Sequence, residues 1–256
     1  MTIIAASVLD ANFAELGKEV DRAVSAGVDM FTLDIMDGHF APRITFGDYV
    51  VGQIRSMTSL PIEAHLMVDR PENWVDRFMD VGVDLVVFHV EATDKQQEII
   101  DKVRARGRKV GVALLSHTPV AEVLKWVVQV DVVNFLAVPV GFGGQSSAPD
   151  TFDRISQLRA YANEQNHALT IEVDGGVKPA NAGLYVDAGA DMLTVGTGLY
   201  HAEDMASAVS LLRASTAAGR SASSDQLLRE LQGARVTEGI DHDAINRAGR
   251  AIGAKD

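Results

Sequence analysis

Acidic residues stand at the ends of two strongly apolar segments. The segment 32–40, TLDIMDGHF, runs from apolar residues into Asp34 and Asp37, and the segment 169–174 ends in Asp174. A buried carboxylate costs roughly several kcal/mol unless it is paired, protonated or bound to a metal. These acids therefore either face solvent where a strand ends or bind a ligand.

Asp34 and Asp174 are residues suited to proton transfer. Two carboxylates that face each other across a ligand can remove a proton from one face and deliver a proton to the other. Together with His65, which lies near the end of another apolar segment, they could also share a divalent ion that polarises a substrate carbonyl. A single aspartate is more simply explained as a helix cap or a loop tie, but two with a histidine favour the chemical interpretation.

Three glycine-rich turns follow apolar segments later in the chain. Backbone N–H groups in such turns can hold phosphate, and barrel enzymes commonly bind phosphate after their last two strands. One such turn could be a plain tight turn, but three in consecutive positions predict a phosphate-binding site. The residues concerned are Gly141, Phe142, Gly143 and Gly144, then Gly175 and Gly176, and then Gly196 and Thr197.

The chain alternates between strand-like and helix-like segments. Apolar runs typical of parallel strands buried on both faces occupy 3–6, 30–34, 62–66, 85–89, 110–114, 132–137, 169–174 and 192–195. Amphipathic stretches predict helices at about 11–26, 47–57, 71–81, 94–106, 119–127, 149–165, 179–188 and 204–214. Eight such units close best as a (β/α)8 TIM barrel, whose strand ends meet at one face and form the active site. An open doubly wound sheet is the alternative, but it would rarely hold eight uninterrupted units in this length.

A short repeat recurs at the junctions between these units. It reads AGVDM at 26–30, VGVDL at 81–85 and AGADM at 188–192, each time between an amphipathic stretch and an apolar run. This pattern predicts a helix that ends at a glycine, then a turn and a buried strand.

The composition excludes several classes of function. The chain has 256 residues and a formal net charge of −12, so nucleic acid and anionic membranes are unfavourable partners. It contains no cysteine, which excludes disulfides and a thiolate nucleophile. The N-terminus lacks a basic segment and no run of about 18 apolar residues occurs, so we expect neither a signal peptide nor a membrane span, and a cytoplasmic location.

The amino-acid composition of the chain changes at about residue 215. The stretch ASTAAGRSASSD is small and polar, as linkers are, and Leu227, Leu228 and Leu231 then recur at helical spacing. Ile245 and Ile252 mark a second short amphipathic piece. We expect a barrel domain at 1–216 and, at 217–256, a linker and helical tail that packs on the outside of the barrel or on a neighbouring subunit.

Several motifs in order resemble the ribulose-phosphate 3-epimerase family, which includes allulose-6-phosphate 3-epimerase. They are SVL at 7–9, LDIMDGHFAPRITFG at 33–47, AHLMV at 64–68, HVEA at 89–92, GFGGQ at 141–145, IEVDGG at 171–176 and VGTG at 195–198. The resemblance covers about residues 3–213. It implies a barrel of the ribulose-phosphate-binding type, a homo-oligomer, and inversion at C3 of a ketose phosphate through an enediolate.

The resemblance also implies roles for individual residues. Asp34 and Asp174 correspond to the acid/base pair and, with His65, to ligands of a divalent metal, typically zinc, iron or manganese. Substrate contacts are implied for a further set, namely Ser7, Met36, His65, Met67, Gly141, Phe142, Gly143, Gly144, Gly175, Gly176, Gly196 and Thr197.

The chain departs from the family pattern at the reacting end. Thr32 stands where the family has a histidine as its fourth metal ligand, and a hydroxyl is a poor zinc ligand compared with imidazole. The loop after the fifth strand, with Ser116 and His117, and the pair Pro139 and Val140 after the sixth also differ. We therefore expect a weakly held, exchangeable divalent ion, and His117 is interpreted as a surface loop residue.

These observations predict an epimerase of a phosphorylated pentulose or hexulose. The alternative is a barrel that binds sugar phosphates without turning them over, or that runs a diverged proton-transfer reaction. A decarboxylase or hexulose-phosphate synthase ranks lower, because those sites carry a lysine in an Asp-x-Lys-x-x-Asp pattern and no lysine occurs near Asp34.

Overall fold

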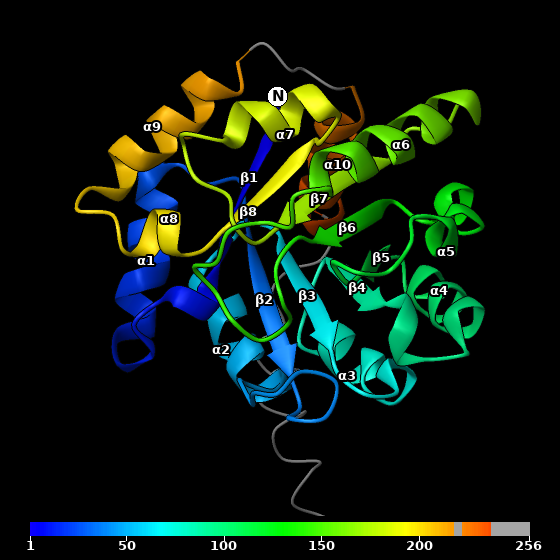
Figure 1. The fold of residues 1–256 in the computed structure, drawn as a ribbon. Helices are drawn as coiled ribbons and strands as arrows, with labels where there is room; N and C mark the ends of the chain where they lie inside the picture. Colours follow the sequence, from blue (N-terminus) through cyan, green and yellow to red (C-terminus); the bar gives the residue numbers. More distant parts are fainter. Residues whose placement is uncertain (218–221, 237–256) are drawn as a thin grey trace, which may run out of the picture.

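The computed structural model describes residues 1–217 and 222–236, and its centre is a closed parallel β-barrel (Figure 1). Each strand pairs with the next along the chain, and the first pairs with the eighth. The strands are β1 Ile3–Ser7, β2 Met30–Met36, β3 Ile62–Met67, β4 Leu85–His89, β5 Lys109–Leu114, β6 Val132–Leu136, β7 Thr170–Asp174 and β8 Met192–Val195. The predicted (β/α)8 barrel is therefore confirmed.

Helices follow the strands and surround the barrel (Figure 1). They are α1 Leu16–Ala26, α2 Asp48–Met57, α3 Val75–Asp80, α4 Gln96–Ala105, α5 Ala121–Leu124, α6 Thr151–Glu164, α7 Ala182–Ala188, α8 Thr197–Tyr200, α9 Met205–Ser215 and α10 Ala222–Val236. Helix α8 is a single turn that the sequence pattern did not indicate. Among the described residues, none of these helices has the length and apolarity to cross a membrane.

Strand β2 is longer than the sequence predicted. It continues two residues past Asp34 to Met36, because Met36 still pairs with Met67 on β3 and its N–H donates to the hydroxyl of Thr45. The extension carries a methionine from each of two neighbouring strands to the same edge of the barrel.

The inside of the barrel changes from apolar to polar along the strands. Alternate residues of a strand share a face, so Met30, Thr32 and Asp34 of β2 form one inward series. Met30 packs in an apolar cluster with side chains of other strands, whereas Thr32 and Asp34 are buried polar residues. Along β2 the inward side chains thus change from apolar to polar toward the carboxyl end of the strand.

The aspartate of the repeated glycine–aspartate junction forms a hydrogen bond to the backbone of the neighbouring strand. Gly82 adopts a φ of 91° just after α3, which a residue with a side chain rarely does, and Asp84 then accepts the backbone N–H of Ile62 at 2.8 Å. Arg55 lies 3.2 Å from the same carboxylate. Asp29 and Asp191 accept the backbone N–H groups of Ile4 and Ile171 in the same way. The repeat therefore sets the register of strands at the amino-terminal end of the barrel.

Helix α10 packs against that amino-terminal end. Leu227 and Leu231 are buried in one cluster with inward residues of the barrel, including Ile3, Leu85 and Met192. The hydroxyl of Ser224 donates to the backbone oxygen of Met1 at 2.8 Å, and Glu230 pairs with Lys109. The helix predicted from the three leucines is confirmed. The predicted piece around Ile245 and Ile252 lies outside the described residues, and the division at residue 216 stays a prediction.

Replacing Leu231 by alanine is expected to lower the free energy of unfolding by about 2–4 kcal/mol, because it leaves a cavity beneath the barrel. Leu211→Ala is the matched control, since Leu211 is 59% exposed on α9 and its truncation is expected to cost under about 0.5 kcal/mol. Urea unfolding of both variants measures the difference. An equal, small effect of the two substitutions would mean that α10 contributes nothing to the stability of the barrel.

Candidate active site

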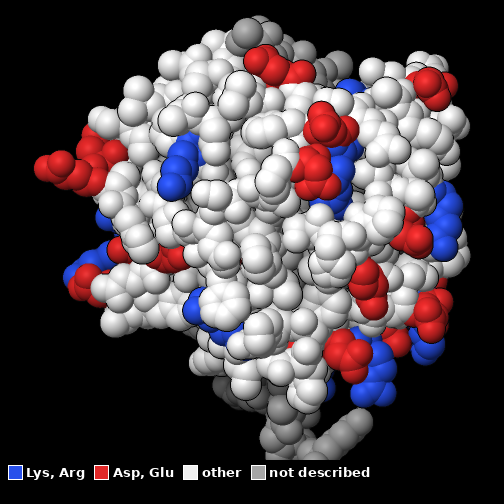
Figure 2. Space-filling model, viewed as in Figure 1, with Lys and Arg blue, Asp and Glu red and all other residues white. Residues whose placement is uncertain are grey.

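A pocket opens at the carboxyl ends of the strands. Its wall combines the ends of β1, β2, β3, β6, β7 and β8 with the loops that follow them. In the space-filling view, Lys, Arg, Asp and Glu side chains gather toward the edge of the molecule, and the middle of that face is mostly uncharged (Figure 2). The lining residues are Ser7, Leu9, Asp10, Asp34, Met36, Met67, Leu136, Val138, Pro139, Gly141, Phe142, Gly143, Gly144, Asp174, Gly175, Gly176, Val177, Thr194, Gly196 and Thr197.

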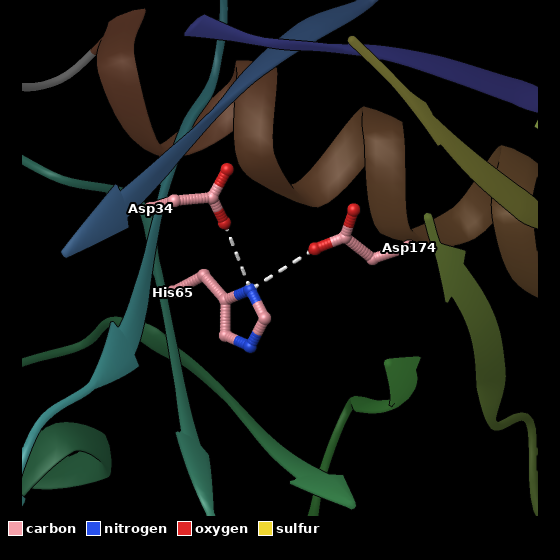
Figure 3. Close-up of side chains that lie close together, drawn as sticks. All are labelled: Asp34, His65 and Asp174. Carbon is pink, nitrogen blue, oxygen red and sulfur yellow. Dashed lines mark hydrogen bonds and ion pairs between the residues drawn. The ribbon is translucent and has the colours of Figure 1, made fainter. Parts of the chain in front are cut away.

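Two carboxylates meet one imidazole at the inner end of the pocket. Asp34 from β2 and Asp174 from β7 converge on the same ring nitrogen of His65 (Figure 3). The Nδ1 atom of His65 lies 3.1 Å from Oδ1 of Asp34 and 3.2 Å from Oδ2 of Asp174. The hydroxyl of Ser7 donates to the other oxygen of Asp34 at 2.7 Å. The three side chains from three strands therefore form one cluster beside the pocket.

The electrostatics of this cluster favour a protonated histidine between the acids. Burial acts to lower the pKa of His65, but hydrogen bonds and attraction from Asp174 and Asp34 outweigh it and raise the pKa well above its usual value. Burial, together with repulsion by Asp34, raises the pKa of Asp174 to about 6. Asp174 can therefore hold or release a proton near neutral pH, as an acid/base residue must.

A second histidine extends the cluster toward β4. Nε2 of His65 lies 3.0 Å from Nε2 of His89, whose Nδ1 lies 3.3 Å from Oε2 of Glu91. Burial lowers the pKa of His89 to about 4, helped by repulsion from His65, so His89 is neutral at pH 7. Its Nε2 then accepts the proton of His65 Nε2, and its own proton faces Glu91. The hydrogen-bonded chain from Glu91 through His89 therefore holds the ring of His65 at its Nε2 atom.

Glu91 should make the folded state sensitive to acid. Burial acts to raise the pKa of Glu91, but His89, Thr118 and the N–H of Leu115 lower it to about 2. A depressed carboxyl pKa contributes stability above the unfolded value of about 4.5 that is lost as pH falls toward 2. We expect Glu91→Gln to be less stable than the wild type by about 1–3 kcal/mol at pH 6, with the difference shrinking below pH 4.

Urea unfolding at several pH values between 3 and 6 measures that difference, and Glu122→Gln, on the exposed side of α5, is the control. A gap between Glu91→Gln and the wild type that stays constant over this range would contradict the assigned role of Glu91.

The Asp34, His65 and Asp174 group can hold a divalent metal. Their ligand atoms all lie within 4.8 Å of one another, and all three residues are buried. Two carboxylates and one imidazole are a common donor set for zinc, manganese and iron. The residues therefore fit the metal that the sequence resemblance implied.

Thr32 takes no part in that donor set. Its hydroxyl lies 3.3 Å from the hydroxyl of Thr194, which donates to Oε1 of Glu172 at 2.6 Å. Because the proton of Thr194 is used toward Glu172, Thr32 is the donor to Thr194. The residue at the position of the family's fourth ligand is thus held in a separate hydrogen-bonded chain inside the barrel.

The glycine turns need glycine for steric reasons. A Cβ on Gly175 would lie 2.5 Å from Cγ2 of Val138, and a Cβ on Gly176 would lie 2.7 Å from the backbone nitrogen of Ser147. Both residues also have positive φ angles, 96° and 76°. The turns therefore bring backbone close to any ligand in the pocket.

At the mouth of the pocket, the side chain of Phe142 is 47% exposed, and the guanidinium of Arg43 lies 5.4 Å from its ring.

The structure gathers the residues that the sequence singled out. Every residue predicted to contact substrate lines the pocket except His65, which is fully buried beside it. His117 is exposed and does not line this pocket, as its interpretation as a surface residue requires. Sequence reasoning missed Asp10, an acid that follows the SVL motif at the end of β1. The one available signal was its position three residues after the end of β1.

Comparisons with known proteins agree on a family. The family model described as "Ribulose-phosphate 3 epimerase family" matches residues 3–200. Ribulose-phosphate 3-epimerase of Bacillus subtilis is 37% identical over 84% of this chain and 100% of its own length. The chloroplastic ribulose-5-phosphate-3-epimerase of Arabidopsis thaliana is 40% identical over 83% of this chain and 76% of its own length. These matches confirm the resemblance inferred from the motifs.

Solved structures agree on the fold. A 3-hexulose-6-phosphate synthase from Salmonella typhimurium superposes with a TM-score of 0.64 at 17% sequence identity, over 86% of this chain and 100% of that one. At this level of identity the likeness shows the shared barrel and nothing about the reaction.

Proposed function

The chain belongs to the ribulose-phosphate 3-epimerase family, and we propose that it is a ketose-phosphate 3-epimerase whose acid/base pair is Asp34 and Asp174. The observation that carries this proposal is the placement of two carboxylates from different strands at one nitrogen of His65, at the inner end of a pocket with glycine turns at its wall. The substrate would be a phosphorylated pentulose or hexulose.

The two carboxylates perform complementary steps in this proposal. One aspartate removes the proton from C3, and the electron pair left behind shifts toward the C2 carbonyl to give an enediolate. The other aspartate, protonated, delivers a proton to C3 from the opposite face and so inverts it. Asp174, with a pKa of about 6, can serve in either role near neutral pH. Ser7 positions Asp34 through its hydrogen bond and, as a residue that lines the pocket, would lie next to the substrate hydroxyls.

Asp34, His65 and Asp174 would hold the divalent ion, with zinc, manganese or iron as the candidates. When bound, such an ion acts as a Lewis acid that stabilises negative charge on the oxygens next to C3. Three protein ligands leave positions for substrate oxygens, but without an imidazole from position 32 the ion should be weakly held and exchangeable.

The phosphate of the substrate would lie against the glycine turns. Gly143 and Gly144, Gly175 and Gly176, and Gly196 and Thr197 present backbone at one side of the pocket, and the glycines add no side chain there. Met36 and Met67 would pack on the carbon chain between the two ends. The homo-oligomeric state and cytoplasmic location expected from the sequence stay predictions.

A screen for C3 proton exchange tests the proposal and identifies the sugar. The protein is incubated in D2O with a panel of pentulose and hexulose phosphates, and deuterium at C3 is followed by NMR. We expect exchange and formation of the C3 epimer with at least one member of the panel. No exchange with any of them, with and without added Mn²⁺ or Zn²⁺, would favour the alternative of a barrel that only binds sugar phosphates.

A further inference from the structure

Asp10 places a carboxylate inside the region proposed for the substrate phosphate. Asp10 ends the short 3-10 turn Val8–Asp10 that follows β1, and it lines the pocket. A Cβ built on Gly196 would lie 2.0 Å from Oδ2 of Asp10, and one on Gly143 would lie 2.8 Å from Oδ1. The two carboxylate oxygens therefore pack directly against the glycine turns that follow β8 and β6.

The groups around this carboxylate are those that attract an anion. The backbone N–H of Thr197 forms a hydrogen bond with it, and the nearby side chains of His201 and Arg43 also act to lower its pKa. Burial outweighs these contacts and raises the pKa of Asp10, with repulsion by Asp34 adding to the rise. The Asp10 carboxyl group is thus partly desolvated and held by the same kinds of group that bind phosphate oxygens.

A phosphate bound at these turns would compete with the Asp10 carboxylate for the same position. Both are anions that need the same backbone donors, and at separations of a few Å like charges repel strongly in a partly buried pocket. A ligand that brings a phosphate to the turns must displace the carboxylate from Gly143, Gly196 and Thr197. The free energy for that displacement must come from contacts between the rest of the ligand and the reacting end of the pocket.

We propose that Asp10 is a specificity-determining residue, an internal anion that competes with the substrate phosphate for the turns after β6 and β8. This inference rests on the proposed function, in that the turns are taken as the phosphate site. Asp10 weakens the binding of inorganic phosphate and of short phosphate esters. It favours a ketose phosphate long enough to reach the Asp34, His65 and Asp174 cluster at the same time.

Binding of inorganic phosphate tests this without any catalysis. Phosphate is titrated into the wild type, Asp10→Ala and Asp10→Asn by isothermal calorimetry, with folding checked by thermal unfolding. We expect both substitutions to tighten binding of phosphate by on the order of ten- to a hundredfold. Asp187→Asn, on the exposed side of α7, removes the same charge outside the pocket and should change the dissociation constant less than about twofold.

Kinetics with a ketose phosphate separate this inference from the proposed function. Asp10→Ala should lower KM for the ketose phosphate while leaving kcat within a few-fold of the wild type. Tighter phosphate binding without turnover of any ketose phosphate would support the inference and contradict the proposed function. Normal turnover, with phosphate affinity in Asp10→Ala and Asp10→Asn equal to or weaker than in the wild type, would overturn the inference and leave the proposed function intact.

Discussion

Replacing Asp34 or Asp174 by asparagine is expected to lower kcat for epimerisation by about three orders of magnitude. Asparagine keeps the shape of the side chain but cannot accept or deliver the proton at C3, and losing a catalytic proton carrier commonly costs this much. Each residue serves as base in one direction and as acid in the other, so each substitution should impair both directions. Coupled assays of the forward and reverse reactions measure the effect.

The control for these two variants is Asp187→Asn, which makes the same chemical change on an exposed face of α7. It should leave kcat within about twofold of the wild type. An Asp174→Asn variant that keeps more than a tenth of wild-type kcat would remove Asp174 from the acid/base pair, whatever the behaviour of Asp34→Asn.

Replacing His65 by alanine is expected to weaken binding of Zn²⁺ or Mn²⁺ by a hundredfold or more. Loss of a hydrogen bond to a metal ligand costs about 10–100-fold in affinity, and loss of the ligand itself should cost at least as much. Thr32→His should act in the opposite direction by adding an imidazole near Asp34. Both effects are measured as metal content after dialysis against a chelator and as affinity by competition with a chromophoric chelator.

His117→Ala is the matched control for the metal experiment, since His117 is exposed and does not line the pocket. It should leave metal content unchanged. If Thr32→His changes neither metal content nor activity and the protein works metal-free, then protein groups alone stabilise the enediolate. Unchanged metal affinity in His65→Ala would place the metal away from the Asp34, His65 and Asp174 cluster.

The barrel and the position of its reactive groups could be predicted from the sequence because both depend on local patterns. Apolar runs mark the strands, glycine–aspartate junctions precede β2, β4 and β8, and Asp34, His65 and Asp174 each lie at or near a predicted strand end. Parallel strands of one barrel bring those ends to a common face, so residues from β2, β3 and β7 meet although they are far apart in the chain.

What could not be predicted depends on contacts between distant segments. Asp10 reaches the turns at Gly143 and Gly196 because the loops after β1, β6 and β8 converge, and nothing in the SVL motif indicates that approach. The interior chain from Thr32 through Thr194 to Glu172 likewise exists because the barrel closes, so that β8 pairs with β7 and lies one strand away from β2. Position in one strand does not reveal which residue faces it across a closed barrel.

Glu63 illustrates the same limit. Its position in β3, beside apolar residues, gives no sign that its side chain is fully buried inside the barrel with neither carboxylate oxygen hydrogen-bonded to any described residue. Burial raises the pKa of Glu63 well above its usual value, and repulsion by Glu172 adds to the rise, so Glu63 is neutral over a wider range of pH than an exposed glutamate. Packing of eight strands, and not the local sequence, creates that environment.

The most direct test of the two-base account follows the partial reactions of the single variants. In D2O, Asp34→Asn retains Asp174 as a base on one face of C3, and Asp174→Asn retains Asp34 on the other. With the substrate found in the screen and both C3 epimers in hand, NMR measures deuterium at C3 in each epimer separately. The account predicts that each variant exchanges the C3 proton of one epimer without inverting it, and that the two variants act on opposite epimers. Exchange of both epimers by either variant, or of the same epimer by both, would contradict it.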